Sequence, residues 1–136
     1  MPVIRDELMQ VRASDDIVRV RQMVRALAVE LGFGLVDQTK IVTAASELAR
    51  NTLDYGLGGT TLMEVLEENS RIGLRITFED NGPGIADIDL AMTDGYTSGR
   101  GLGLGLSGAK RLSNEFTIES RVGEGTRIAI TRWKGR

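Results

Sequence analysis

The chain of 136 residues contains no cysteine and no histidine. These absences exclude disulfides, thiolate nucleophiles, zinc sites built from Cys and His, Ser-His-Asp triads and autophosphorylation on an imidazole. Any acid–base chemistry must therefore use carboxylates, lysine or tyrosine.

An excess of positive charge and long apolar runs are absent as well. Seventeen Lys and Arg against nineteen Asp and Glu leave a formal net charge of -2, so no overall basic field attracts nucleic acid or an anionic membrane. The sequence shows no basic leader followed by an apolar stretch and no run of about 18 apolar residues. We therefore expect a cytoplasmic protein with no nucleic-acid partner and no membrane partner.

What is present is the composition of an ordinary folded domain. Hydrophobic residues make up 41% of the chain and charged residues 26%, which is typical of globular proteins rather than disordered, collagen-like or membrane-spanning ones. A single hydrophobic core usually serves about 100–200 residues. We therefore expect one domain over residues 1–136.

Periodicity at the start of the sequence predicts a strand and a helix. Residues 3–11 favour an edge strand. Ser14 before Asp15 and Asp16 is typical of a helix start, because a hydroxyl can accept from free amides and acids complement the positive end of the helix dipole. The helix is predicted to end at Gly32. Its apolar stripe consists of Ile17, Val20, Val24, Leu27 and Leu31.

A second helix and two strands are predicted next. The helix should run from about residue 36 or 37 to residue 55 and stop at the glycine-rich segment 56–59. Residues 60–68 alternate well enough for a strand, and residues 72–79 alternate more clearly between apolar and polar side chains. The buried stripe of the helix is predicted to consist of Ile41, Ala45, Leu48 and Thr52.

The remainder is rich in glycine before strands return. Eight of the seventeen glycines lie between Gly82 and Gly108, a density that weakens regular structure and lets backbone amides approach a ligand closely. A short helix is predicted over 106–112 and a hairpin over 116–121 and 126–133. This order favours the α+β class, as a two-layer α/β sandwich in which helices cover one face of a mostly antiparallel mixed sheet beside a glycine-rich lid.

Two short motifs place polar groups beside predicted elements. Glu47 and Asn51 lie four residues apart, and therefore on one face of the second helix, away from its apolar stripe. Asp80 follows a clear strand, where it can accept a hydrogen bond from an exocyclic amine, while Gly82 and Gly84 let the chain turn and pass close to a flat ligand. Taken alone, the first motif is more often an exposed polar pair on a solvated helix face, and the second is more often an ordinary turn.

A third motif alternates glycine with apolar residues over 99–108. Its free amides could cradle phosphate oxygens in front of a helix, although a surface loop is the plain alternative. The segment matches G-x-G-x-x-G, but no buried strand precedes it and the element order is not βαβ, so a dinucleotide-binding fold is disfavoured. The Walker A pattern fails because Ala109 separates Gly108 from Lys110. Gly125-Thr126 starts the last strand and is merely a turn on its own.

In order, these motifs resemble the four sequence boxes of the GHKL ATPase/kinase superfamily, which includes gyrase, Hsp-type chaperones, histidine kinases and MutL. They correspond to an E-x-x-x-N helix, a strand ending in D-x-G-x-G, a G-x-G-x-G lid hinge and a late G-T. Over nearly its whole length the chain is also similar to the RsbT branch of the bacterial anti-sigma-type serine/threonine kinases. That similarity rests on residues 31–34 with 36–38, 46–51, 80–85 and 108–112 with 115–116.

The resemblance implies a Bergerat-type ATPase fold that uses ATP and Mg²⁺. It implies a protein kinase that phosphorylates a Ser or Thr on STAS-domain proteins, which in the RsbT branch are the stressosome scaffold and its small STAS antagonist. The released kinase of that branch binds and activates a PP2C-type phosphatase that starts the general stress response.

The resemblance also implies a role for each motif residue. Glu47 matches the general base that takes the proton from the attacking hydroxyl, and Asn51 matches the Mg²⁺ ligand. Asp80 matches the adenine contact, and Thr126 matches the threonine that supports it. The expected glycine positions are Gly82 and Gly84 for clearance beside the adenine, and Gly101, Gly103 and Gly105 for the phosphate lid.

Two other functions share the same boxes. One is an ATPase without a protein substrate, which the small size, with no dimerising or transducer domain attached, disfavours. The other is an anti-sigma factor that sequesters a sigma factor and uses ATP only to regulate its grip. The sequence alone does not separate these functions from the kinase.

Overall fold

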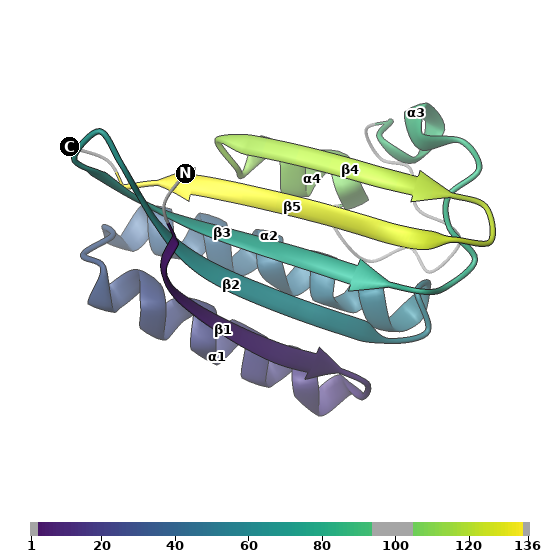
Figure 1. Ribbon diagram of the computed structural model, residues 1–136, viewed down its shortest axis with the longest axis horizontal. Coiled ribbons are helices and arrows are strands. Elements are labelled where there is room, and N and C mark those ends of the chain that lie inside the picture. Colours follow the sequence, from purple (N-terminus) through teal and green to yellow (C-terminus); the bar gives the residue numbers. More distant parts are fainter. Residues whose placement is uncertain (1–2, 94–104, 135–136) are drawn as a thin grey trace.

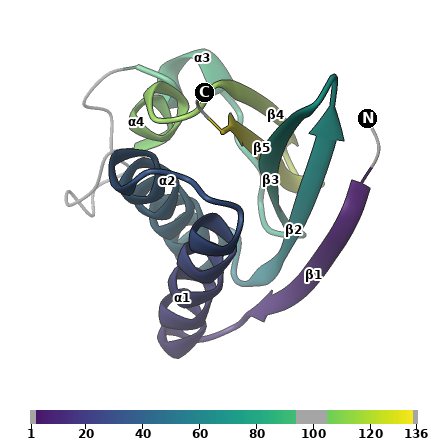
Figure 2. The same cartoon turned by 90° about the vertical axis from the view of Figure 1, so that its left-hand side faces the viewer.

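The structure is a computed structural model that describes residues 3–93 and 105–134, and these residues form one sheet with helices on one of its faces (Figures 1 and 2). The strands are β1 (Val3–Val11), β2 (Gly59–Glu68), β3 (Arg71–Asp80), β4 (Glu115–Arg121) and β5 (Gly125–Trp133). The helices are α1 (Ser14–Glu30), α2 (Leu35–Asp54), α3 (Ile88–Ala91) and α4 (Gly105–Arg111). The predicted two-layer α+β class is confirmed. No helix in the described ranges is long and apolar enough to cross a membrane.

The sheet has the strand order β1-β2-β3-β5-β4, and each pair of neighbours is antiparallel. The chain therefore leaves β3, enters the sheet again at its far edge as β4, and returns between the two as β5. This crossover places Thr126, at the start of β5, directly opposite Asp80, at the end of β3. Two motifs that are 46 residues apart in sequence thus meet at one end of the sheet.

The core lies between the helices and one face of the sheet, as Figure 2 shows. The predicted stripes of α1 and α2 are buried, except that Leu31 is only partly covered. The stripes pack against alternate residues of the three central strands, and each large side chain buried in this way stabilises the fold by about 1.5–3 kcal/mol. The main sheet contributions are Met63, Val65, Leu74, Ile76, Phe78, Ile128 and Ile130.

The cap of α1 differs from the prediction. The helix begins at Ser14, but its N-cap residue is Ala13, and the cap is made by the carboxylate of Asp16. This carboxylate accepts from the backbone amides of Arg12 (2.8 Å) and Ala13 (3.0 Å). The Arg12 amide, the Arg19 guanidinium and the Ala13 amide hold the pKa of Asp16 below its ordinary value. A carboxylate reaching back from the first turn therefore replaces the expected Ser14 hydroxyl.

The short helix α3 was not predicted. It spans only Ile88–Ala91, and its start is fixed by Asp87, whose Oδ1 accepts from the Leu90 amide at 2.9 Å. None of its residues is buried. A single turn held by one cap leaves no apolar period for sequence reasoning to detect.

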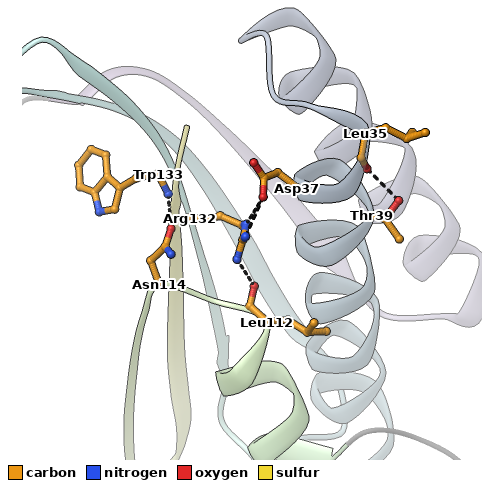
Figure 3. Close-up of polar contacts among 7 residues, drawn as sticks. All are labelled: Leu35, Asp37, Thr39, Leu112, Asn114, Arg132 and Trp133. Carbon is orange, nitrogen blue, oxygen red and sulfur yellow. Dashed lines mark hydrogen bonds and ion pairs between the residues drawn. The ribbon is translucent and has the colours of Figure 1, made fainter. Parts of the chain in front are cut away.

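A partly buried ion pair ties α2 and α4 to the sheet (Figure 3). Arg132 of β5 donates to Asp37 Oδ1 in the first turn of α2, from Nη2 at 2.7 Å and from Nε at 3.2 Å. Its Nη1 donates to the carbonyl of Leu112, just after α4, at 2.9 Å. The Arg132 side chain is only 13% exposed, so these charge-assisted bonds compete little with water. Arg132 therefore fixes the position of two helices relative to β5.

We predict that Arg132→Met lowers the free energy of unfolding by about 1–3 kcal/mol, because methionine fills similar space but leaves the Asp37 carboxylate and the Leu112 carbonyl without this donor. Denaturation in urea measures the change. The matched control is Arg5→Met, which removes a pair with Glu30 whose side chains are 46% and 56% exposed and should cost at most about 0.5 kcal/mol. Equal losses in the two variants would contradict the role given to Arg132.

Candidate functional site

Asp80 is the centre of the candidate site. It is the last residue of β3, and its side chain points to the helix side of the sheet because it alternates with the buried Phe78 and Ile76. Its Oδ1 accepts from the backbone amides of Gly82 (2.9 Å) and Thr126 (3.2 Å). Within residues 3–93 and 105–134, Oδ2 receives no hydrogen bond. One carboxylate oxygen is thus held in place while the other can accept from a ligand.

The surroundings of Asp80 also shift its ionisation. Burial raises the pKa of this carboxyl above its ordinary value, and the amides of Gly82 and Thr126 oppose that shift by favouring the charged form. Glu79, the preceding residue, adds a small repulsion. A half-buried acceptor of this kind binds a ligand donor with less competition from water than an exposed carboxylate would.

The predicted glycines after Asp80 are packed against the protein itself. A Cβ at Gly82 would lie 2.7 Å from the Gly56 carbonyl oxygen. A Cβ at Gly84 would lie 2.0 Å from the Arg121 carbonyl oxygen, and Gly84 has a positive φ of 76° that other residues rarely adopt. Packing within the fold therefore requires both glycines. That they also leave space for a ligand beside Asp80 stays a prediction.

Thr126 supports Asp80 through its backbone rather than its hydroxyl. Its amide donates to Asp80 Oδ1, while its hydroxyl lies 2.8 Å from the Ser120 hydroxyl. Ser120 Oγ also accepts from the Ile85 amide at 2.7 Å and lies 3.0 Å from the Gly125 carbonyl. The last residues of β3, the loop that follows and the β4–β5 hairpin therefore form one polar cluster.

Ser120 is a site residue that sequence reasoning missed. A single serine in a strand carries no motif. The β4–β5 hairpin pairs Ser120 with Thr126, and the pairing of β5 with β3 then brings both residues to Asp80. Besides the bond from the Ile85 amide to Ser120, a second bond joins the loop after Asp80 to the hairpin, since the Gly123 amide donates to the Pro83 carbonyl at 2.8 Å. The loop after Asp80 is thus held by the hairpin at two points.

Glu47 and Asn51 lie on α2, where both side chains are partly exposed. The helix ends beside Asp80, because a Cβ at Gly56 would lie 2.3 Å from Asp80 Oδ2. At 1.5 Å per residue, Asn51 stands about 7–8 Å and Glu47 about 13–14 Å from Gly56 along the helix axis. Asn51 and Glu47 therefore lie at increasing distance from Asp80 along α2.

The lid glycines are only partly covered by the structure. Gly105 is the first residue of α4 and has a positive φ of 69°. Helix α4 packs beside α2 (Figure 2). Gly101 and Gly103 lie outside the described residues. The phosphate-binding role of all three glycines stays a prediction.

A cavity of about 490 Å³ opens where β3 and β4 end and β5 begins. Asp80 and Thr126 line it, but among the described residues α2 contributes nothing to its lining. The cavity is therefore next to the polar cluster and does not include Glu47 or Asn51. In the described ranges no group of three or more Asp, Glu, His or Cys residues could hold a metal ion. The other lining residues are Glu79, Asn81, Ile88, Glu119, Ser120, Arg121, Glu124, Gly125 and Arg127.

Comparison with known proteins places these motifs in a family. Residues 36–134 match the model of the histidine kinase-, DNA gyrase B-, and HSP90-like ATPase. The serine/threonine-protein kinase RsbT of Bacillus subtilis (strain 168) is 50% identical over 118 residues, which cover 87% of this chain and 89% of that protein. The anti-sigma F factor of Clostridium novyi (strain NT) is 31% identical over 117 residues, 82% of each chain.

A solved structure supports the same fold. The RsbU and RsbW domains of a Mycobacterium tuberculosis protein superpose with a TM-score of 0.67 over 97% of this chain at 20% identity, and this chain spans 33% of that one. The predicted ATPase fold is therefore confirmed. Together with the relatives, it shows that the chain belongs to the histidine kinase-, DNA gyrase B- and HSP90-like ATPases and, within them, to the partner-switching family of RsbT-like serine/threonine kinases and anti-sigma factors.

Proposed function

We propose that the chain transfers the γ-phosphoryl group of ATP to a Ser or Thr of a STAS-domain regulator and, once released, activates a PP2C-type phosphatase. The observation that carries the proposal is the Asp80 carboxylate, whose Oδ1 is fixed by two backbone amides while Oδ2 receives no bond from the described residues. The 50% identity to a serine/threonine-protein kinase supports the reaction class. The STAS and phosphatase partners rest on the resemblance to the RsbT branch, and a cytoplasmic location stays a prediction.

The Asp80 site fits adenine better than guanine. The exocyclic amine of adenine can donate to Oδ2, whereas guanine carries a carbonyl oxygen at the equivalent position and would face a carboxylate with another acceptor. Because this carboxylate is half-buried, an unmatched acceptor there costs more than it would in water. The chemistry of the site therefore selects an amine-bearing purine.

The α2 face fits the other end of the nucleotide. Mg²⁺ prefers oxygen ligands and keeps several waters when it binds phosphates, so one amide oxygen from Asn51 would suffice to hold it against the phosphate chain. The ion would neutralise charge as the γ-phosphoryl group leaves ADP and bonds to the substrate hydroxyl oxygen. Glu47, one turn earlier on the same face, would accept the hydroxyl proton.

The principal alternative is a binding module that sequesters a sigma factor, and the 31% identity to an anti-sigma F factor favours it as the second candidate. Incubation of the pure chain with γ-labelled ATP, Mg²⁺ and a STAS-domain protein separates the functions. Label on a STAS Ser or Thr supports the kinase. Release of phosphate alone supports an ATPase, and neither activity together with tight sigma-factor binding supports sequestration.

We predict that Glu47→Gln slows phosphoryl transfer by about 10²–10⁴-fold and leaves ATP binding nearly unchanged, because the amide keeps the size of the side chain but cannot take a proton. Single-turnover kinetics measures the transfer and calorimetry the binding. Glu67→Gln, an exposed change on β2 away from the candidate site, is the matched control and should leave the transfer rate as it is. Transfer by the Glu47 variant at the wild-type rate would reject this assignment.

We predict that Asp80→Asn weakens ATP binding by about 10- to 100-fold, because it replaces a charged acceptor by an amide that can also present a donor. GTP should be affected less, since its carbonyl can accept from that amide. Calorimetric titration with both nucleotides measures the difference. An unchanged affinity for ATP would count against the Asp80 site.

A further inference from the structure

We propose that Gly56 is a positioning residue for nucleotide selectivity: the absence of a side chain at this position allows the Asp80 carboxylate to stand where Oδ2 can accept from the amine of the base. The inference rests on the proposed function of the Asp80 site and assigns it a residue that none of its sequence motifs contains. Gly56 follows the end of α2 by two residues and is buried.

The contact between Gly56 and Asp80 leaves no room for a methyl group. A Cβ at residue 56 would lie 2.3 Å from Asp80 Oδ2, 2.3 Å from Cγ and 2.6 Å from Cβ. These separations are far shorter than the roughly 3.5–4.0 Å of an ordinary contact. The backbone itself does not demand glycine, because Gly56 is not among the residues with positive φ. The neighbouring carboxylate is therefore the reason for the glycine.

The end of α2 is anchored and cannot easily move away from a larger residue. The Gly56 amide donates to the Asn51 carbonyl at 3.1 Å, and the Gly58 amide donates to the Thr52 carbonyl at 2.9 Å. On the other side, a Cβ at Gly59 would lie 2.0 Å from the Glu79 carbonyl oxygen, so the chain after α2 already packs closely on β3.

The Asp80 carboxylate is held less firmly than the end of α2. It is held by two hydrogen bonds to Oδ1, one of them 3.2 Å long. Rotation about its own side-chain bonds relieves the contacts to Oδ2 and Cγ, whereas the contact to Asp80 Cβ, at 2.6 Å, also requires a shift of the adjoining backbone. An alanine at residue 56 should therefore displace the Asp80 carboxylate from its two amides, by side-chain rotation together with a shift of the adjoining backbone. The consequence is a loss of the contact that distinguishes an amine from a carbonyl on the base.

The test compares ATP with inosine triphosphate, which carries a carbonyl oxygen in place of the amine. Wild type should prefer ATP, and Gly56→Ala should lose about tenfold or more in affinity for ATP while its affinity for inosine triphosphate changes little. The matched control is Gly34→Ala at the other end of α2, where a Cβ would meet nothing within 4 Å. If Gly56→Ala lowered the affinities for ATP and inosine triphosphate by the same factor, the cause would be a general loss of stability, and the inference would be overturned.

A double variant tests whether Gly56 acts through Asp80. In the Asp80→Asn background the amine contact is already removed, so Gly56→Ala should add no further change in the ratio of the two affinities. Additive changes in that ratio would overturn the inference.

The other possible results separate a failure of this inference from a failure of the proposed function. If wild type prefers ATP and Gly56→Ala keeps the full preference, the inference fails while the proposed function stands. If wild type binds no adenine nucleotide, the proposed function fails and the inference fails with it. If Gly56→Ala does not fold, the Gly56 amide resonance of the wild-type chain decides: it should shift on addition of ATP and shift less in Asp80→Asn, and an unmoved resonance would overturn the inference.

Discussion

The site depends on the pair of hydrogen bonds that backbone amides donate to Asp80 Oδ1. One amide belongs to the turn that follows β3, and the other belongs to β5, so the carboxylate joins a local turn to a long-range strand pairing. These bonds leave Oδ2 without a hydrogen bond from the described residues. They also favour the charged form against the burial that raises the pKa of Asp80. In the proposed function this carboxylate recognises the base, and two fixed donors keep it in place when the base binds.

The rest of the fold holds the partners of Asp80 in place. The crossover that inserts β5 between β3 and β4 supplies the Thr126 amide and brings in Ser120. The anchored end of α2 closes the other side of the carboxylate and continues, toward its N-terminus, into the helix that carries Asn51 and Glu47. Arg132 ties the first turn of that helix and the end of α4 to the same strand, β5. Strand β5 therefore bonds to both the sheet layer and the helix layer of the molecule.

Sequence periodicity predicted most elements and the two-layer class, because α1, α2 and the strands bury regular stripes that are local in sequence. Periodicity gave no correct prediction where a local feature is fixed by a single side chain. The Asp16 carboxylate capped α1 in place of the Ser14 hydroxyl, and α3 is a single capped turn. The motifs named Asp80 and Thr126 but not the contacts of Ser120, Gly56 or Arg132, because each of these meets a partner that only the strand order or the helix end brings near. Gly101 and Gly103 lie outside the described residues.

The most direct measurement is a structure of the chain with Mg²⁺ and a non-hydrolysable ATP analogue. The account predicts the exocyclic nitrogen of adenine at hydrogen-bond distance, about 3 Å, from Asp80 Oδ2, with the phosphates extending along α2 toward Asn51 and Glu47. An adenine bound elsewhere, or one whose amine meets no atom of Asp80, would contradict it.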